Sequence, residues 1–459
     1  MQIHSFINNT STSLETQFTK KNPYTSEVLH TVDSAGMLEV VMSIQAAQKA
    51  FADWKTSSLE NRLQLLQSFH NHLAMSKDSF ARFEALDQGL PFEFVRDNGM
   101  GSLITSLDKV MRELSGHRPQ ANQTFTPVGV VSIICTWNLS LRVIGERLFP
   151  AIAAGNAVII KVSSQSPVTA MIMAELIQLS QAPAGLIQVI TSDQEDVKKL
   201  LVTHPGIKAI SFVGQLTNAT EILKLTSANS LQRFKKLQIS SGSKNSAVAL
   251  SEPTDEIFKK VISSFVTGQG QLGWNSSRLF ILEKNEAAWK EKIADYFMNV
   301  KPSESIDDSS LWTPCLKEES FKTFSEISAL AVSDQARLIQ TSKPANKNFL
   351  PMTFTQDMSN CSTLQQDQVM APLFILSTVK YAFDVAKYSN VSYFGMAAHL
   401  YGDEDKLAKV ADSLDVGLIC KNKWSVQLPG SVKATKQSGF GLQDDRVFGD
   451  FFSNVKLLT

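Results

Sequence analysis

The sequence predicts an α/β protein with two domains built on parallel sheets. The chain has 459 residues, more than a single hydrophobic core usually holds. Between about 128 and 225, short apolar stretches typical of buried strands alternate with stretches typical of helices, and the alternation resumes after 245. Strands that alternate with helices favour parallel sheets with right-handed crossovers.

The predicted elements before residue 245 are strands and helices in turn. We expect strands at 128–134, 157–160, 187–190 and 209–213 and helices at 36–55, 59–75, 140–153, 167–181 and 193–203. Gly155 and Asn156 predict a turn. Ser166 is predicted as an N-cap and Pro167 as the first helical residue, since the missing N–H of proline costs nothing there.

After residue 245 the pattern predicts a second α/β unit. We expect strands at 247–250 and 279–282, helices at 254–266 and 286–298, and a final strand at 453–458. Between a predicted helix and a predicted strand lies GQGQLG (268–273), a literal G-x-G-x-x-G string. The dinucleotide fingerprint requires the opposite order, a strand before and a helix after, so we interpret this string as a Gly-rich loop.

Composition excludes several classes of function. With 44 basic and 44 acidic residues, the chain has no broad charged surface for nucleic acid. No run of 18 apolar residues predicts a membrane span, and the N-terminus lacks the pattern of a secretory signal. The four cysteines match neither a disulfide framework nor a zinc site, and the seven histidines do not cluster. We therefore expect a cytoplasmic protein without a metal site.

The Gly-rich loop, GQGQLGWNSSR (268–278), resembles the active-site loop of the aldehyde dehydrogenase superfamily. The catalytic cysteine of that family lies two residues after a Gly-Gln pair, which places its position at Gly273. Arg278 matches the arginine that follows it. Further segments resemble the family in the same order along the chain, 127–140, 153–170, 211–215, 240–250, 368–373, 390–404 and 437–441. The similarity covers roughly 20–459 and implies an aldehyde dehydrogenase-like α/β fold.

The resemblance also implies that two catalytic groups are missing. The family needs a thiolate to attack the aldehyde carbon and a base to activate water. At the nucleophile position Gly273 has no side chain, and at the position of the general-base glutamate Ser240 carries a hydroxyl that is no acceptor of protons near neutral pH. Asn138 matches the catalytic asparagine, either as an oxyanion donor or only as a turn residue.

Other side chains offer no evident replacement. Cys135 lies three residues before Asn138, where we expect a small buried residue facing the sheet or the adenosine. Cys315, Cys361 and Cys420 match no catalytic position. Ser276 and Ser277 are near Gly273 in sequence, but no base is evident to activate them.

The resemblance implies NAD or NADP as the cofactor, bound weakly or not at all. The residues at cofactor-contacting positions are Trp137, Lys161, Ser164, Gly214, Gln215 and Gln368. Lys161 either contacts the adenosine ribose or is a solvated lysine at a strand end. Trp137 is either core or pocket wall, and Gly214 meets a backbone requirement with or without a cofactor. Gln368 replaces a ribose-binding glutamate and so lacks its charge.

The family's architecture assigns three parts to this chain. A cofactor-binding-type α/β domain would span 1–111 and 127–239, and a former catalytic α/β domain 240–425. A small oligomerisation element would come from 112–126 and 426–459, which implies a homodimer or homotetramer.

Three functions remain open at this stage. The chain is a catalytically inactive or strongly impaired relative with a binding or regulatory role, an active NAD(P)-dependent oxidoreductase with altered chemistry, or a structural subunit of an active paralogue. Simultaneous loss of nucleophile and base favours the first.

Overall fold

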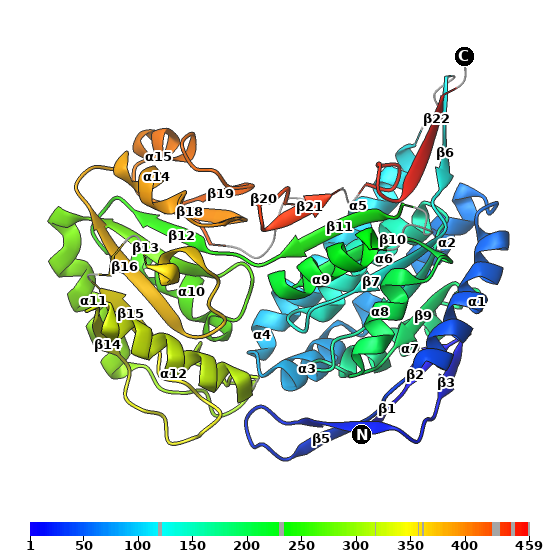
Figure 1. Cartoon of the computed structure of the whole chain (residues 1–459), viewed down its shortest axis with the longest axis horizontal. Helices are drawn as coiled ribbons and strands as arrows, with labels where there is room; N and C mark the ends of the chain where they lie inside the picture. Colours follow the sequence, from blue (N-terminus) through cyan, green and yellow to red (C-terminus); the bar gives the residue numbers. More distant parts are fainter. Residues whose placement is uncertain are drawn as a thin grey trace.

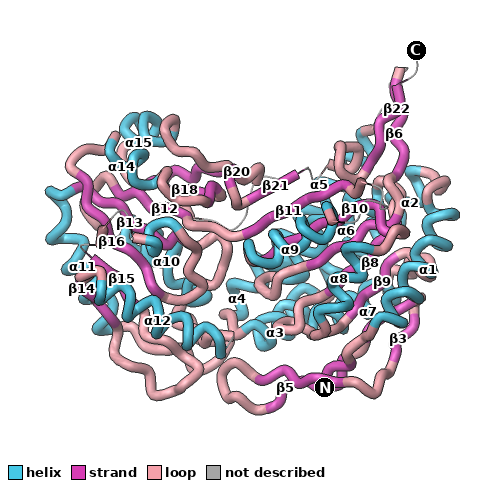
Figure 2. Tube along the Cα trace, in the orientation of Figure 1, coloured by secondary structure: helices cyan, strands magenta, loops and turns pink. Residues whose placement is uncertain are grey.

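The structure, a computed structural model, has two lobes, each built around one large sheet (Figure 1). It describes residues 1–457 apart from seven short gaps, 118–121, 229–233, 317, 357, 360–361, 425–431 and 442–445. Figure 2 shows that helices cover the sheets of both lobes. The predicted α/β class is therefore confirmed.

The first sheet has eight strands, and its five central strands run parallel. Its order is β21 (Gly439–Gly441), β11 (Lys236–Ser241), β10 (Ile207–Gly214), β7 (Val130–Ile134), β8 (Ala157–Lys161), β9 (Ile187–Ile190), β2 (Ser5–Ile7) and β3 (Thr10–Thr12). The strands β7 to β10 confirm the four strands predicted from apolar stretches. The edges β21, β2 and β3 pair antiparallel.

The helices of this lobe include every helix predicted before residue 245. They are α1 (Met37–Trp54), α2 (Leu59–Met75), α3 (Lys77–Gln88), α4 (Phe92–Phe94), a π-helical turn (Val95–Met100), α5 (Gly101–Gly116), α6 (Ser140–Ala153), α7 (Val168–Leu179), α8 (Glu195–Thr203) and α9 (Leu216–Ser227). Helices α3 to α5 were not predicted from the sequence, although α5 lines the site described below and α3 holds the turn that carries part of it.

The expected start of α7 was wrong in detail. Pro167 is the N-cap and Val168 the first helical residue, and the cap makes no side-chain hydrogen bond of its own. Instead the carboxylate of Asp87, on α3, accepts from the backbone N–H of Val168 at 3.3 Å, and Ser166 accepts from the Gln88 amide at 3.1 Å. The buried carboxylate of Asp87 therefore takes the place of the side-chain cap that was predicted at Ser166.

The second sheet has seven strands, all parallel except for one edge. Its order is β14 (Arg337–Gln340), β15 (Thr353–Gln356), β16 (Leu373–Val379), β13 (Ser276–Leu282), β12 (Asn245–Ala249), β18 (Ala397–Tyr401) and β19 (Leu418–Lys421), with β14 antiparallel. Its helices are α10 (Asp255–Val266), α11 (Glu286–Asn299), α12 (Glu318–Ser333), α13 (Thr363–Gln366), α14 (Asp384–Ser389) and α15 (Glu404–Ala411), with 3₁₀ turns at Thr267–Gly270 and Glu283–Asn285. The predicted strands near 247 and 279 are its central pair.

In the part of the chain that the structure describes, three smaller sheets complete the fold. They are β1–β5–β4 (Gln2–Ile3, Val28–Asp33, Gln17–Lys21), β17–β20 (Phe394–Gly395, Thr435–Lys436) and β22–β6 (Ser453–Leu457, Gln123–Pro127). The β6–β22 ribbon projects from the first lobe (Figure 1). It includes the predicted final strand and part of the predicted 112–126 segment, whose residues 112–116 instead end α5.

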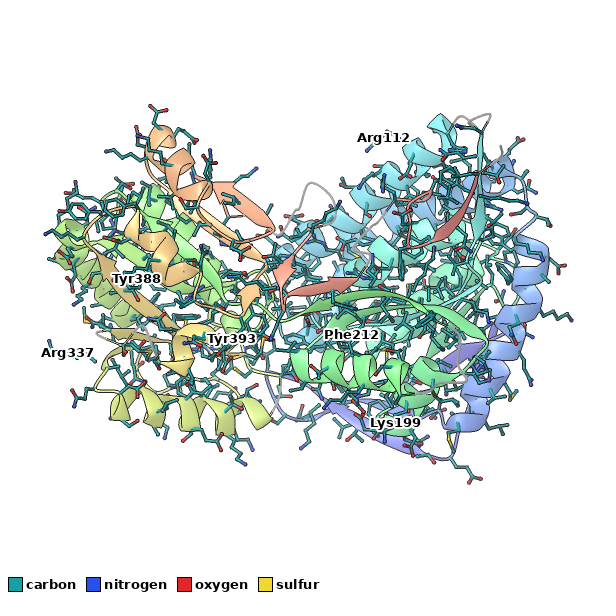
Figure 3. All side chains as sticks on the ribbon, turned by 45° about the horizontal axis from the view of Figure 1, so that its top comes forward. Arg112, Lys199, Phe212, Arg337, Tyr388 and Tyr393 are labelled. Carbon is teal, nitrogen blue, oxygen red and sulfur yellow. The ribbon has the colours of Figure 1, made fainter. Side chains whose placement is uncertain are left out.

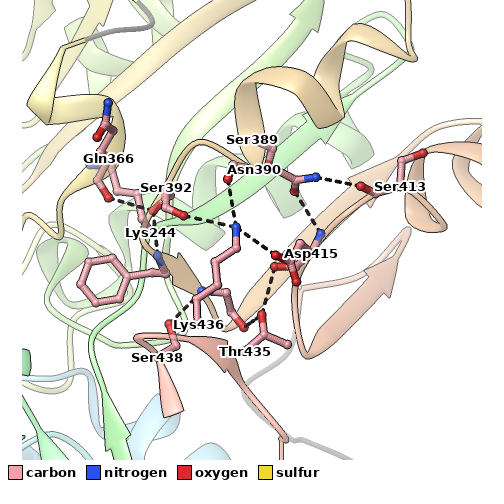
Figure 4. Close-up of polar contacts among 12 residues, drawn as sticks. Lys244, Gln366, Ser389, Asn390, Ser392, Ser413, Asp415, Thr435, Lys436 and Ser438 are labelled. Atoms are coloured by element: carbon pink, nitrogen blue, oxygen red, sulfur yellow. Dashed lines mark hydrogen bonds and ion pairs between the residues drawn. The ribbon is translucent and has the colours of Figure 1, made fainter. Parts of the chain in front are cut away.

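Within the described residues, the chain crosses between the lobes twice, once after β11 and once between β20 and β21. Figure 4 shows the polar contacts that fix the return at β20. Lys436 donates to the carbonyls of Asn390 and Ser392 at 2.9 and 3.2 Å and forms an ion pair with Asp415 at 3.3 Å. These contacts attach the C-terminal segment to the second lobe before it adds β21 to the first sheet.

Candidate functional site

A cavity of about 580 Å³ lies at the carboxyl ends of the parallel strands of the first sheet and receives a loop of the second lobe. All nine residues predicted for the site line it: Trp137, Asn138, Lys161, Ser164, Gly214, Gln215, Ser240, Gly273 and Gln368. A volume of this size suits a small-molecule site. The structure thus brings the predicted residues together, while their individual roles remain predictions.

Asn138 lies in a turn that other parts of the chain hold in place. The next residue, Leu139, adopts a left-handed backbone with φ 50°, which is costly for a leucine. The Gln88 side chain accepts from the Leu139 N–H at 2.9 Å, and Glu84 accepts from the Leu141 N–H at 2.9 Å. Both partners come from α3, so α3 caps the N-terminus of α6 and fixes the Asn138 turn.

Glu84 and Asp87 are fully buried carboxyls. Burial raises the pKa of Glu84 to about 7 and that of Asp87 to about 6. Neither group lines the cavity. We interpret both as positioning groups for the starts of α6 and α7 rather than as acids or bases in the site.

Gly273 lies in a loop that two asparagines hold. Asn245 donates to the carbonyls of Gly273 and Asn275 at 2.9 and 3.0 Å, and Asn138 donates to the carbonyl of Gln271 at 3.1 Å. A Cβ added at Gly273 would have no heavy atom within 4 Å, and the backbone of Gly273 is not left-handed. The loop therefore leaves room for a side chain at the nucleophile position without supplying one.

The order predicted around the Gly-rich string is confirmed. The string follows α10 and precedes β13, so it is not the start of a helix that could receive a pyrophosphate. Gly268, Gln269 and Gly270 all have positive φ, which explains why glycine is needed at two of these positions.

Ser240 and Cys135 face the cavity from strand ends. Ser240 is half-buried on β11, opposite Gly439 of β21. Cys135 follows β7 and is buried, as predicted, and burial raises the pKa of its thiol to about 12. A thiol with that pKa is protonated at neutral pH and is a poor nucleophile.

The other described thiols are structural. Cys315 is buried and donates to the Gln269 side chain at 2.7 Å, and burial raises its pKa. Cys420 is buried on β19, also with a raised pKa. Neither lines the cavity, and Cys361 lies outside the described residues.

One sequence interpretation needs correction. Ser276, on β13, does have a basic partner, because its hydroxyl lies 3.0 Å from Nδ1 of His399 on β18, which is two strands away on the far side of β12. Ser264 donates to the Ser276 hydroxyl at 3.0 Å. Because Ser276 and His399 are both fully buried and do not line the cavity, this pair links strands and helix in the core rather than activating a nucleophile.

This buried histidine gives the protein an acid-sensitive element. Burial lowers the pKa of His399 from 6.5 to about 4, so the folded state favours the neutral ring. Its contribution to stability is full above pH 6.5 and is lost as the pH falls towards 4, up to roughly 3 kcal/mol. We expect urea unfolding to show the wild type losing more stability than His399→Asn between pH 7.5 and 4.5. Equal losses in the two proteins would contradict this assignment.

Lys161 is half-buried at the cavity wall, and its contact with a ribose stays a prediction. Its ammonium donates to the carbonyl of Ser192 at 2.8 Å, and burial lowers its pKa to about 8. It ends β8 at the cavity wall, beside Ser163 and Ser164. A lysine there can offer a partly desolvated charge to a ligand hydroxyl or phosphate.

The N-terminus of α9 opens on the same part of the cavity. Gln215 is its N-cap without a side-chain cap bond, and the first turn carries no acidic residue. Gly214, Gln215 and Asn218 line the cavity. Uncapped amides and the helix dipole make this end suitable for an anion such as a phosphate. Gly214 has an ordinary φ, and a Cβ there would lie 2.5 Å from the Phe212 ring, so the requirement for glycine is steric.

One wall of the cavity was not predicted from the sequence. It is formed by Ser102, Thr105, Ser106, Lys109 and Arg112 of α5, Arg142, Val143, Glu146 and Arg147 of α6, and Trp274. The polar residues of α5 recur at helical spacing opposite an apolar face of Leu103, Leu107, Val110 and Leu114. That amphipathic pattern is readable from sequence and could have located the wall.

Within the described residues, no group of three or more His, Cys, Asp or Glu is arranged to hold a metal ion. In the same part of the chain, no helix is long and apolar enough to cross a membrane.

Comparison with known proteins shows which family has this fold. A profile of the aldehyde dehydrogenase family matches residues 9–458. Mouse 2-aminomuconic semialdehyde dehydrogenase is 24% identical, with 100% of this chain and 98% of the relative covered, and glutarate-semialdehyde dehydrogenase of Pseudomonas putida is 24% identical, with 95% and 93% covered. The solved structure of aldehyde dehydrogenase KauB from Pseudomonas aeruginosa superposes with a TM-score of 0.90 at 21% identity, covering 100% of this chain and 96% of that one.

The fold and the cavity define a two-lobed α/β protein with its site where strand ends of one lobe meet a loop of the other. The chain belongs to the aldehyde dehydrogenase family. An indole-3-acetaldehyde dehydrogenase and a Bacillus cereus aldehyde dehydrogenase of this fold have been solved with NAD⁺, at TM-scores of 0.89 and 0.91.

Proposed function

We propose that this chain is a catalytically inactive or strongly impaired member of the aldehyde dehydrogenase family, with a binding or regulatory role. The observation that carries the proposal is the Gly273 loop. It enters the cavity at the nucleophile position, it has room for a side chain, and it presents only a backbone. Glycine cannot form the covalent bond to a carbonyl carbon on which the family's chemistry depends.

The surroundings support the same conclusion. Ser240 faces the cavity with a hydroxyl where the family has a carboxylate, and the loss of a general base alone typically costs about 10²–10⁴ in rate. Cys135, the one cavity-lining cysteine among the described residues, has a pKa of about 12. Asn138 uses its amide to hold the loop at Gln271 rather than standing free.

The cavity nevertheless retains features that fit NAD or NADP. The uncapped N-terminus of α9 and the Lys161 ammonium suit a pyrophosphate and a ribose, and Gln368 can hydrogen-bond a second ribose without charge. A bound dinucleotide would supply a hydride acceptor. The cavity beside the dinucleotide, including the Gly273 loop, would hold and orient a ligand without forming the covalent intermediate.

The proposed inactivity is tested by an assay of aldehyde oxidation. We expect purified protein with NAD or NADP and a panel of aldehydes to give no more nicotinamide absorbance change than a Gly273→Trp variant, in which an indole fills the nucleophile position. Turnover well above that variant would overturn the proposal. Calorimetric titration with each dinucleotide, done on the same preparation, reports separately whether the cofactor end of the cavity binds.

The second candidate function is an oxidoreductase that transfers hydride directly from an aldehyde hydrate. Its support is that Asn138 and Lys161 both line the cavity. This candidate requires dinucleotide binding, so absence of a calorimetric signal at millimolar NAD and NADP would exclude it. Binding together with turnover above the Gly273→Trp variant would favour it over inactivity.

We also propose that the β6–β22 ribbon serves oligomerisation. It projects from the first lobe, and Val455 and Leu457 on β22 are exposed apolar residues (Figure 1). An exposed two-stranded ribbon is a ready edge for pairing with another chain. A homodimer or homotetramer, or pairing with an active paralogue, would place it in an interface, and co-purification from the native cell separates these outcomes.

A further inference from the structure

Two neighbouring turns form one side of the cavity. The first, 135–139, follows β7, and the second, 163–167, follows β8, which pairs with β7. The first turn contributes Asn138 to the cavity wall, and the second contributes Ser164. Phe212, which lines the same cavity, marks its place near the middle of the molecule in Figure 3. The separation of the two turns therefore sets the width of the cavity at the ends of β7 and β8.

One buried side chain, that of Gln88, contacts both turns. Gln88 is the last residue of α3, is 1% exposed and does not line the cavity. Its Oε1 accepts from the backbone N–H of Leu139 at 2.9 Å, and its Nε2 donates to the hydroxyl of Ser166 at 3.1 Å. A backbone N–H can only donate, so the amide oxygen must face Leu139 and the NH₂ group must face Ser166. This amide joins the end of the first turn to the second turn.

The bond to Leu139 also supports a strained backbone. Leu139 is fully buried and left-handed, with φ 50°, a conformation that persists for such a residue only where surrounding contacts impose it. A buried N–H without an acceptor is itself unfavourable. Loss of the Gln88 amide would therefore leave the Leu139 N–H without this acceptor and remove a contact that imposes the left-handed conformation.

The neighbouring carboxylates of α3 each hold one helix start. Glu84 accepts from the Leu141 N–H at 2.9 Å and from Nε2 of Gln88 at 3.0 Å. Asp87 accepts from the Val168 N–H at 3.3 Å. Glu84 thus supports the start of α6 and Asp87 the start of α7, whereas the amide of Gln88 contacts both sides.

The end of α3 that carries Gln88 is fixed between the two lobes. Gly89 caps the helix with φ 64°, and a Cβ added there would lie 2.9 Å from both Pro23 and Pro314. Pro23 belongs to the turn between β4 and β5, and Pro314 belongs to the second lobe. Gln88, one residue before this packed glycine, is therefore held in place from outside its own helix.

We infer that Gln88 is a positioning residue of the cavity, whose amide sets the separation of the turns that follow β7 and β8. The inference goes beyond the proposed function and does not depend on whether the chain oxidises aldehydes. Substitution of Gln88 should let the two turns move apart without removing any group that lines the cavity.

Cys135 is a natural reporter of this separation. It is 7% exposed, it belongs to the first turn, and its backbone N–H donates to the carbonyl of Lys161, at the end of β8, at 3.3 Å. The experiment measures the rate at which iodoacetamide alkylates Cys135, by mass spectrometry of peptides, and divides it by the wild-type rate at the same pH. Gln88→Met has a similar length but no amide, so it should raise this ratio at least about tenfold at both pH 6 and pH 9.5.

Gln88→Glu should give a pH profile that a loss of packing would not give. Because Nε2 of Gln88 lies 3.0 Å from the Glu84 carboxylate, a carboxyl at position 88 would face that of Glu84, and two such groups strongly resist ionising together. At pH 6 the pair holds a proton and can still bond to the Leu139 N–H, so the alkylation ratio should stay close to the wild-type value. At pH 9.5 the pair loses that proton, and repulsion should raise the ratio at least about tenfold.

Other titratable groups pack around the same end of α3. They are Asp87, His30 of β5, which lies 3.5 Å from Asp87, and the buried Lys20 of β4. All three are present in the wild type and in both variants, so their own titration cancels in the ratio. Gln67→Met is the matched control, since Gln67 is exposed on α2 and donates to Asn71, and it should leave the ratio unchanged at both pH values.

The same measurement separates local movement from general loosening. Cys315 and Cys420 are buried in the second lobe, and their alkylation rates should not change in either variant. The positioning role is overturned if Cys135 in Gln88→Met reacts at the wild-type rate, or if Cys315 and Cys420 accelerate by the same factor. It is also overturned if Gln88→Glu shows the same ratio at both pH values, and this arm carries the test should Gln88→Met fail to fold. Aldehyde turnover would overturn the proposed inactivity without changing these ratios, so the two failures are distinguishable.

Discussion

Gly273→Cys combined with Ser240→Glu is expected to create aldehyde-oxidising activity in a chain that we propose to be inactive or strongly impaired. A cysteine fits at Gly273 because no heavy atom lies within 4 Å of an added Cβ and the backbone φ is ordinary. The loop remains held by Asn245 and Asn138, so the new thiol would face the cavity. Cysteine is intrinsically nucleophilic, and part of it is thiolate at neutral pH.

The two substitutions should act in sequence. Gly273→Cys alone should give a stoichiometric acylation burst with p-nitrophenyl acetate, a readout that needs no cofactor. Adding Ser240→Glu should raise subsequent hydrolysis by about 10²–10⁴, the usual contribution of a general base. Stopped-flow absorbance follows both phases.

Gly116→Cys is the matched control, since that exposed glycine at the end of α5 also has nothing within 4 Å of an added Cβ and lies outside the cavity. This control variant should react with iodoacetamide, yet p-nitrophenyl acetate should acylate it at least about tenfold more slowly than Gly273→Cys. If Gly273→Cys reacts readily with iodoacetamide but is acylated no faster than Gly116→Cys, a cysteine at position 273 is not enough to restore acylation.

Local patterns located much of the fold, whereas the site residues were predicted from the resemblance to the family. Strands β7 to β10 are apolar stretches bounded by turns, so short-range sequence information was sufficient for them. Strands β1 to β5 were missed because they are short and largely polar. In β4 (QFTKK), for example, only Lys20 is buried, and the pairing with β5 determines the strand.

The contacts that organise the site depend on residues far apart in the chain. Gln88 reaches Leu139 across 51 positions, and Ser276 meets His399 across 123. No spacing rule connects such pairs, because the topology of the sheets brings them together. The same reason explains why the cap of α7 was wrongly assigned to Ser166, although the composition at that helix start favoured it.

Asn156→Ala is expected to be among the most destabilising single substitutions in the chain. The sequence predicted only a turn here, but the fully buried side chain makes four hydrogen bonds. Its oxygen accepts from the N–H groups of Val128 and Gly129 at 2.7 and 3.0 Å, and its amide donates to the carbonyls of Ala151 and Phe452 at 3.0 and 2.9 Å. Alanine removes all four bonds. The Ala151 carbonyl keeps the backbone N–H of residue 156 as a donor at 3.0 Å, but the N–H groups of Val128 and Gly129 and the Phe452 carbonyl lose this partner, at a cost of about 3–5 kcal/mol.

The same side chain ties the start of β7 and the end of α6 to the segment that leads into β22, so its loss should loosen the ribbon as well as lower stability. Urea unfolding measures the free-energy change, and limited proteolysis reports release of the C-terminal segment. Asn156→Asp keeps the two bonds in which the side-chain oxygen accepts. If those two bonds matter most, the protease should cleave this variant more slowly than Asn156→Ala. Asn299→Ala, which removes an exposed side chain bonded only within α11, should be nearly neutral. A loss below about 1 kcal/mol for Asn156→Ala would show that backbone packing alone holds the β6–β22 ribbon to the first sheet, because the three groups left without this partner would then have found others at little cost.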